Sequence, residues 1–91
     1  MEPNINTELA KELVLEARKC YQNKNAQDGL ILLEKAKDIF IRARDYEHYI
    51  EAENFMGVIY SAMGNESMAI DIYLDCLELA RKKRIHRYIT L

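Results

Sequence analysis

The chain matches itself when it is shifted by forty residues. Small residues then fall on small ones, and large apolar residues mostly fall on large apolar ones. The matched positions are Ala17 with Gly57, Cys20 with Tyr60, Gly29 with Ala69, Leu30 with Ile70, Leu33 with Tyr73 and Ala36 with Cys76. Self-similarity at a period of roughly 20 to 50 residues is typical of folds that stack one structural unit. The chain therefore has to use one local structure twice.

The repeated unit is predicted to be a pair of helices. Apolar residues recur with the period of about 3.6 that marks one helix face, and no segment alternates as a strand does. The predicted helices cover residues 7–22, 26–43, 46–63 and 66–83. Asn25 and Asn65 are expected as N-caps, and Gly64 is expected to end the third helix. The only proline is Pro3, so the fold class is expected to be all-α.

Short connections predict that these helices form two antiparallel hairpins within one domain over residues 1–91. The first hairpin is expected over 7–43 and the second over 46–83. The stretch "HYIEA" from His48 resembles "RYITL" from Arg87, which predicts the first helix of a third hairpin over 85–91. A closed four-helix bundle and an open stack are both compatible with two hairpins, and the internal repeat favours the stack.

Gly57 lies inside the most apolar of the predicted helices, where glycine costs about 1 kcal/mol relative to alanine. We expect it to mark a close approach of two helices, with Ala69 as its small counterpart. Packing of Tyr60 and Tyr73 would offset the cost, because burying one large side chain contributes about 1.5–3 kcal/mol. Ile70 is expected in the same core.

Residues 50–80 resemble a tetratricopeptide repeat. The residues that match the family pattern are Met56-Gly57, Tyr60, Gly64-Asn65, Ala69, Tyr73, Cys76 and Leu77-Glu78-Leu79. Glu53 replaces the usual tryptophan, Cys76 replaces the final small residue, and the closing proline is absent. Residues 9–43 match less well, and the spacing is near forty rather than thirty-four.

This resemblance implies a non-catalytic stack of helical hairpins that binds a protein or a peptide. The long spacing is similar to that of repeat arrays in bacterial signalling proteins, such as peptide-responsive regulators and the N-terminal arrays of GGDEF-type diguanylate cyclases. It implies the N-terminal sensory or interaction region of a larger cytoplasmic signalling protein, in which a catalytic domain such as a diguanylate cyclase follows.

In this family, the first helices of successive hairpins line a concave groove. Carrying that geometry over predicts groove residues Lys11, Val14, Arg18, Tyr21, Gln22, Glu51, Asn54, Val58, Ser61 and Ala62. Family members that clamp a peptide carboxylate use lysines and an asparagine. Val14 stands where a clamp lysine is usual and Arg18 where an asparagine is usual, so the resemblance does not imply an acidic C-terminal peptide.

The sequence contains no recognisable catalytic, metal or cofactor motif. His48 and His86 are isolated from each other and from any cysteine pair, and Cys20 and Cys76 lack metal-site spacing. His48 is expected at a helix start, Glu51 and Glu53 as solvated charges, and the cysteines as small apolar residues in a reducing compartment. No apolar run is long enough to span a bilayer, and no secretory signal is visible. We therefore expect neither cofactor nor enzymatic activity.

The charge is unevenly distributed along the chain. Residues 1–80 carry eight Lys/Arg and fifteen Asp/Glu, whereas residues 81–91 carry five Lys/Arg and no acid. An alternative hypothesis is a free-standing four-helix adaptor whose basic tail binds nucleic acid or an acidic partner. The helix dipole already favours cations at this helix end, and the acidic remainder lacks a broad phosphate-binding surface, so nucleic acid is the weaker hypothesis.

Self-association is also predicted, through the C-terminal segment. Tyr88, Ile89 and Leu91 are apolar, and no helix-ending signal follows them in this sequence. Repeat stacks normally cover their end faces with polar residues. We therefore expect a homodimer through this segment.

Overall fold

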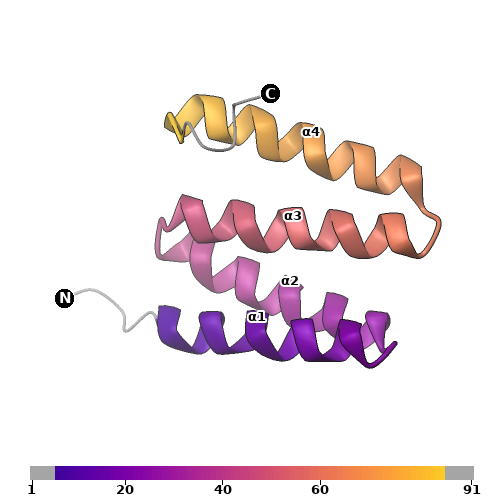
Figure 1. The fold of residues 1–91 in the computed structure, drawn as a ribbon. Coiled ribbons are helices and arrows are strands. Elements are labelled where there is room, and N and C mark those ends of the chain that lie inside the picture. The colour runs from indigo at the N-terminus through magenta and orange to yellow at the C-terminus, as the bar shows by residue number, and fades with distance from the viewer. Residues whose placement is uncertain (1–5, 86–91) are drawn as a thin grey trace.

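The computed structural model describes residues 6–85 of the 91-residue chain. Its four helices are α1 (Thr7–Gln22), α2 (Ala26–Arg42), α3 (Tyr46–Ala62) and α4 (Glu66–Lys83) (Figure 1). No strand occurs among the described residues. The all-α prediction is confirmed, and the predicted helix ends lie within one residue of those observed. Residues 86–91, in which the third hairpin was expected, lie outside the described range.

Side chains that precede the helices account for where three of them begin. The Asn6, Asp45 and Asn65 side-chain oxygens accept hydrogen bonds from backbone N–H groups three residues later, over 3.0–3.2 Å. Each bond satisfies a donor that has no partner within the helix. The expected cap at Asn25 takes another form, because its amide Nδ2 donates to Asp28 Oδ2 over 2.8 Å instead.

The helices end by one recurring turn. Lys24, Arg44, Gly64 and Arg84 stand twenty residues apart, and all have left-handed backbone with φ of 63°, 58°, 86° and 59°. The N–H of the following residue donates back to a helix carbonyl, which closes the turn. These bonds are Asn25 to Cys20 at 2.7 Å, Asp45 to Phe40 at 2.9 Å, Asn65 to Tyr60 at 2.8 Å and Ile85 to Ala80 at 2.8 Å.

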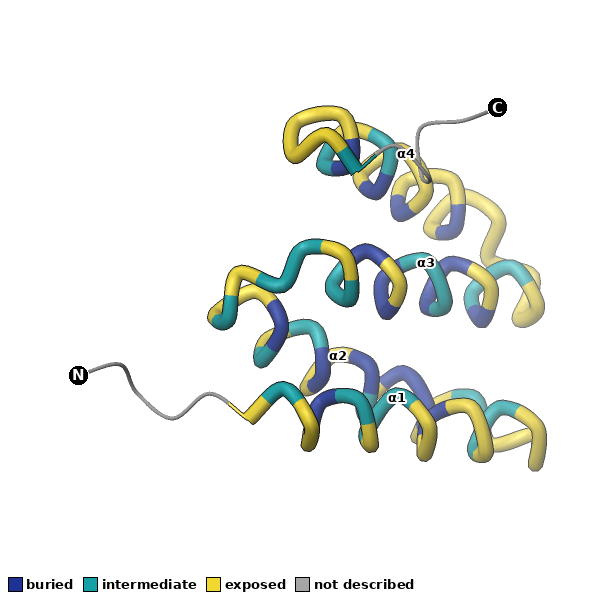
Figure 2. The backbone as a smooth tube through the Cα atoms, turned by 60° about the vertical axis from the view of Figure 1, so that its left-hand side comes forward, coloured by how far each residue is buried: buried dark blue, intermediate teal, exposed yellow. Residues whose placement is uncertain are grey.

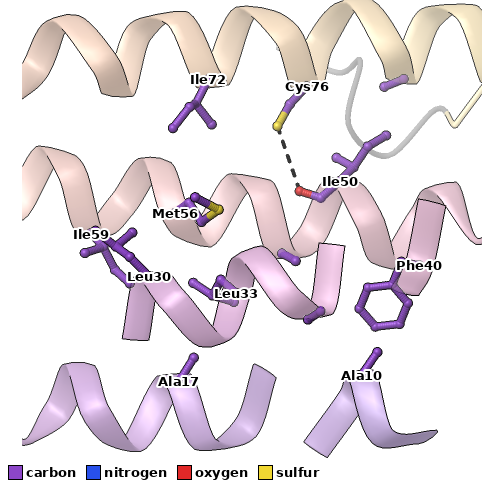
Figure 3. Close-up of a cluster of buried hydrophobic side chains, with 13 residues drawn as sticks. Ala10, Ala17, Leu30, Leu33, Phe40, Ile50, Met56, Ile59, Ile72 and Cys76 are labelled. Atoms are coloured by element: carbon purple, nitrogen blue, oxygen red, sulfur yellow. Dashed lines mark hydrogen bonds between the residues drawn. The ribbon is translucent and has the colours of Figure 1, made fainter. Parts of the chain in front are cut away.

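The helices form an open stack. Each helix packs on the next along the chain, so α2 and α3 separate α1 from α4 (Figures 1 and 2). Four large side chains are fully buried, namely Phe40, Leu33, Ile50 and Ile59. Figure 3 shows this core running from α1 through α2 and α3 to α4. The stack prediction is confirmed, and the closed four-helix bundle is not what the described residues form.

Gly57 is a close-approach position, and the atoms nearest to it belong to the Tyr73 ring of α4. A Cβ built on buried Gly57 would lie 2.6 Å from Tyr73 Cε1, so the tyrosine ring occupies the space that a side chain would need. In the first hairpin, a Cβ on Gly29 would lie 3.2 Å from the Ala17 carbonyl oxygen. Both hairpins therefore use a glycine at the crossing, on opposite helices of the pair.

The expectation that Ile70 belongs to the core is wrong, and Tyr73 is covered only in part, because its ring packs on Gly57. Tyr73 is 37% exposed and Ile70 is 55% exposed, whereas Leu30, the match of Ile70, is only 6% exposed. The difference has a simple cause, because α3 packs on α2 and no described helix packs on the outer side of α4.

Candidate functional site

An open pocket of about 260 Å³ lies between α1 and α3. Its lining comes from three helices: Lys11, Val14, Leu15 and Arg18 of α1, Phe40 of α2, and His48 and Glu51 of α3. Four of the predicted groove residues, Lys11, Val14, Arg18 and Glu51, thus meet around one hollow. The spacing of Lys11, Val14 and Arg18 places them on one face of α1.

Phe40 lies at the base of this pocket. Its side chain is almost fully buried in the core, and the His48 ring stacks on it with 5.3 Å between centroids and 24° between planes. His48 Nδ1 lies 2.8 Å from Asp45 Oδ2, and the His48 backbone N–H donates to Asp45 Oδ1 over 3.2 Å. Asp45 therefore starts α3 and holds the imidazole in place, which is the helix-start position predicted for His48.

An aromatic contact joins α1 to α3 beside the pocket. The Tyr21 and Phe55 rings meet edge to face with 5.7 Å between centroids, and the Arg18 guanidinium carbon lies 5.4 Å from the Phe55 centroid. Edge-to-face ring pairs contribute about 0.5–1.5 kcal/mol beyond their burial. This contact fixes the spacing of the two helices and anchors the Arg18 side chain beside the pocket.

The charges around the pocket are of both signs. Lys11 forms an exposed ion pair with Glu8 over 3.5 Å, and Arg18 and Glu51 face the same hollow. Exposed pairs of this kind contribute little, so the Lys11 ammonium can exchange Glu8 for another carboxylate at low cost. The pocket combines an apolar floor with cations along α1 and one acid on α3.

The other predicted groove residues lie outside the pocket lining. Tyr21 and Asn54 are half-buried, and Gln22, Val58 and Ala62 are exposed. The Ser61 hydroxyl donates to Glu66 Oε2 over 3.0 Å at the α3–α4 turn, so it is held toward that turn. The predicted groove did not include four residues that lie at or beside the pocket, namely Leu15, Phe40, His48 and Phe55. Phe55 shares the helix face of Glu51 at a spacing of four, which is a signal that could have found it.

A second pocket, of about 270 Å³, lies beside α3 and α4. Its lining residues are Tyr49, Glu53, Asp75, Glu78, Leu79 and Lys82. Glu53 is only 7% exposed and lies 3.6 Å from the Lys37 ammonium, so the expectation of a solvated charge is wrong. Burial raises the pKa of Glu53, and Lys37 lowers it in part.

Cys76 lies next to Glu53 and is chemically quiet. Its Sγ lies 3.8 Å from the Ile50 carbonyl oxygen (Figure 3). The same sulfur lies 3.9 Å from Glu53 Oε1. Burial first, and then the Glu53 charge, raise the pKa of this thiol to about 12. The thiol therefore stays protonated at neutral pH and packs as a small apolar residue.

Comparison with known proteins identifies a family. A family model described as "Tetratricopeptide repeat" matches residues 13–82. No curated protein and no solved structure matches the chain. Within residues 6–85, no helix is long and apolar enough to cross a membrane.

Proposed function

Because the chain belongs to the tetratricopeptide repeat family, we propose that it is a non-catalytic module that binds a protein or peptide between α1 and α3. Repeats of this family generally mediate protein–protein interaction. The observation that carries the proposal is the pocket itself. It joins Lys11, Val14 and Arg18 of the first hairpin to Glu51 of the second over an apolar floor.

The lining suggests the chemistry of the ligand. Val14, Leu15 and Phe40 offer contact to an apolar side chain, while Lys11 and Arg18 offer charge-assisted hydrogen bonds to carboxylates. A peptide with an apolar anchor flanked by acidic residues fits this arrangement. The chain lacks the clamp with which some members bind an isolated C-terminal carboxylate. Val14 stands in place of the clamp lysine, and Arg18 stands in place of the clamp asparagine.

We further propose that the module serves as the sensory or interaction region of a larger cytoplasmic signalling protein. The support is the spacing of forty residues between matched positions, which is similar to that of repeat arrays in bacterial regulators. A catalytic domain following in the same protein would be controlled by what the groove binds.

Nucleic-acid binding by the basic end of α4 is the weaker alternative. Arg81, Lys82 and Lys83 stand in the last turn of α4, where the helix dipole favours cations. The Lys83 ammonium lies 4.3 Å from the Tyr46 ring centroid, a cation–π contact within the protein. These contacts give the cations a structural use without a phosphate backbone.

The test is a selection of peptides from a random library on the 91-residue protein, followed by affinity measurements by calorimetry. Leu15→Glu places a charge at the pocket, and Ile31→Glu places the same charge on a similarly exposed apolar residue of α2, outside the pocket. We expect Leu15→Glu to weaken the selected peptides at least about tenfold, whereas Ile31→Glu leaves them unchanged. Equal binding by both variants would refute the proposed groove.

A further inference from the structure

His48 is a partly exposed wall residue of the α1–α3 pocket. It stands in the first turn of α3, and its side chain is 37% exposed. The other polar residues of the lining are Lys11, Arg18 and Glu51. A peptide that enters this pocket therefore comes within reach of the imidazole as well as of the α1 cations.

Three contacts hold the imidazole in one position. Its Nδ1 lies 2.8 Å from Asp45 Oδ2, and the His48 backbone N–H donates to Asp45 Oδ1 over 3.2 Å. The ring also stacks on Phe40, with 5.3 Å between the centroids. Figure 3 shows the Phe40 ring at one end of the buried cluster, so the stacking partner is itself fixed by the core. A side chain held in this way loses little conformational freedom when a ligand binds.

The Asp45 carboxylate determines which ring nitrogen is left for a ligand. An ionised carboxylate can only accept hydrogen bonds, so Nδ1 of His48 must carry a proton in this contact. In the neutral imidazole, Nε2 is then a hydrogen-bond acceptor, and in the imidazolium Nε2 becomes a donor. Uptake of one proton thus converts His48 from an uncharged acceptor into a cationic donor without a change of ring position.

The charged groups that share the hollow with His48 come from two helices. Lys11 and Arg18 belong to α1, and Glu51 stands three residues after His48 on the same side of α3. From α2 the lining takes only the uncharged Phe40, and none of the described α4 residues belongs to it. While the imidazole is neutral, the cations of the pocket come from α1 alone. Protonation of His48 adds a cation on the α3 side, so a ligand carboxylate then finds positive charge on both sides of the pocket.

We propose that His48 is a ligand-contacting residue of the groove, and that its protonation makes the groove prefer acidic peptides as the pH falls; this inference rests on the proposed peptide binding. The Nε2–H of the imidazolium donates a charge-assisted hydrogen bond to a ligand carboxylate, whereas a neutral Nε2 has only a lone pair to offer. Histidine is the side chain that changes charge between about pH 5 and pH 8. Asp45 acts as a positioning residue, because it orients the ring through Nδ1.

The test is calorimetry on the 91-residue protein at several pH values between about 8 and 5.5. The probes are peptides selected from the random library at the acidic end of this range, and the same peptides with Gln and Asn in place of Glu and Asp. We expect the wild-type affinity for acidic peptides to rise about tenfold as the pH falls, and the affinity for their neutral versions to stay constant. Selected peptides that contain no acidic residue, or an affinity for acidic peptides that does not change with pH, would overturn the proposal.

Two substitutions assign the pH response to one of the two histidines in the chain. His48→Gln should abolish the rise in affinity, whereas the control His86→Gln, at a position outside the described residues, should retain it. His48→Phe keeps a ring that can stack on Phe40 but cannot take up a proton, so it should also bind acidic peptides equally across the range. Circular dichroism checks that each variant is folded. A rise that persists in His48→Phe would exclude the imidazole as its source.

Asp45→Asn tests the positioning role. Asparagine keeps a side-chain oxygen that can cap α3 and removes the negative charge beside the imidazole. Because an adjacent carboxylate favours the imidazolium, the rise in affinity should occur at a lower pH in this variant. An unchanged pH profile would show that Asp45 serves only as a helix cap. NMR of the ring nitrogens tests the protein without peptide, and a neutral His48 with its proton on Nε2 would contradict the proposed orientation.

The outcomes separate this inference from the proposed groove. Peptides that are weakened by Leu15→Glu but bind equally at every pH would refute the role of His48 and leave the groove intact. A library that yields no peptide sensitive to Leu15→Glu would refute the groove, and the role of His48 with it. Sedimentation velocity at each pH checks that the oligomeric state is constant, because the homodimer expected through Tyr88, Ile89 and Leu91 involves residues outside the described range.

Discussion

The Tyr73 ring lies directly over Gly57, with its Cε1 2.6 Å from where a glycine Cβ would be built. At the matching positions the first hairpin has Ala17 and Leu33, both fully buried. In the second hairpin, Gly57 thus lacks the methyl group of Ala17, and Tyr73 has a larger side chain than Leu33. Both solutions fill the crossing, but only the ring requires glycine at the position that Ala17 occupies in the first hairpin.

This exchange predicts that Gly57→Ala is harmful only while the tyrosine is present. Alone, we expect it to lower the free energy of unfolding by about 1 kcal/mol, because overpacking outweighs the gain in helix propensity. In a Tyr73→Leu background, which restores the first hairpin's combination, the same change should stabilise by about 1 kcal/mol. Urea unfolding of the four proteins gives the double-mutant cycle. Effects of Gly57→Ala that are equal in both backgrounds would contradict the contact.

The turn residues predict a set of opposite substitutions. Lys24 and Arg44 adopt left-handed φ of 63° and 58°, which is unfavourable for a side chain, whereas Gly64 adopts φ of 86°. We expect Lys24→Gly and Arg44→Gly each to raise the free energy of unfolding by about 0.5–1 kcal/mol, and therefore to raise the melting temperature. Gly64→Ala should cost about 1 kcal/mol through backbone strain alone, because nothing lies within 4 Å of its Cβ position. A neutral Gly64→Ala would be inconsistent with this turn geometry.

Helix caps offer a comparison within one chain. The Asn65 side chain accepts a hydrogen bond from the backbone N–H of Met68, whereas the Asn25 side chain accepts none and donates to the Asp28 carboxylate. Asn65→Ala should therefore cost about 1 kcal/mol, and Asn25→Ala clearly less. Thermal unfolding followed by circular dichroism at the helix band measures the stability of both variants. The reverse order would show that the Asn25–Asp28 pair is the stronger cap.

Glu53 predicts a pH dependence of stability. Burial raises its pKa above the usual 4.5 in the folded chain. A raised carboxyl pKa means that the folded state binds the proton more tightly than the unfolded state does. The contribution to stability is therefore present below the unfolded pKa and is lost as the pH rises through the folded pKa. Relative to Glu53→Gln, the wild type should lose stability as the pH rises above 4.5.

Lys37 provides the control for this pH effect. Its ammonium lowers the pKa of Glu53, so Lys37→Met should raise that pKa further and make the loss of stability with rising pH larger. Urea unfolding at several pH values compares the wild type, Glu53→Gln, Lys37→Met and the double variant. A wild-type profile parallel to that of Glu53→Gln would rule out a raised pKa for Glu53.

The groove predicts a charge preference among the selected peptides. Arg18 lines the pocket, and its neighbour Lys19 is an exposed α1 cation outside the lining. Arg18→Gln should weaken acidic peptides about tenfold, because a charge-assisted hydrogen bond is lost, and Lys19→Gln should not. Fluorescence anisotropy with labelled peptides measures both affinities. Equal losses would indicate a long-range effect of net charge instead of a contact in the groove.

The helices and their order were predictable from the sequence because local chemistry sets them. Asp45 and Asn65 cap helices, Gly64 ends one, and apolar spacing of 3.6 supplies the rest. The burial of Glu53 was not predictable, since its partner Lys37 comes from the preceding helix and their meeting depends on the packing angle. The exposure of Ile70 was not predicted. The repeat gives Ile70 the same place in its hairpin as Leu30, but the burial of that place depends on the helix that follows the hairpin.

The candidate groove was predictable only in part. The family resemblance indicates which face of each hairpin's first helix lines the groove. Helical spacing along that face then predicts four of the pocket residues, namely Lys11, Val14, Arg18 and Glu51. Phe40 contributes from a second helix while almost fully buried, and no pattern distinguishes a core phenylalanine from one that also floors a pocket. His48 enters through its stacking on Phe40, a contact that requires the folded turn around Asp45.

The same turn recurs at Lys24, Arg44, Gly64 and Arg84. The units between these turns therefore connect to one another in the same way. The chain leaves every helix along the same backbone path, whichever side chain occupies the left-handed position. A segment cut at two of these turns therefore begins and ends with matching geometry. Tandem duplication of a forty-residue block would lengthen the stack without a new type of connection, which gives gene duplication and protein engineering a simple way to extend the proposed groove.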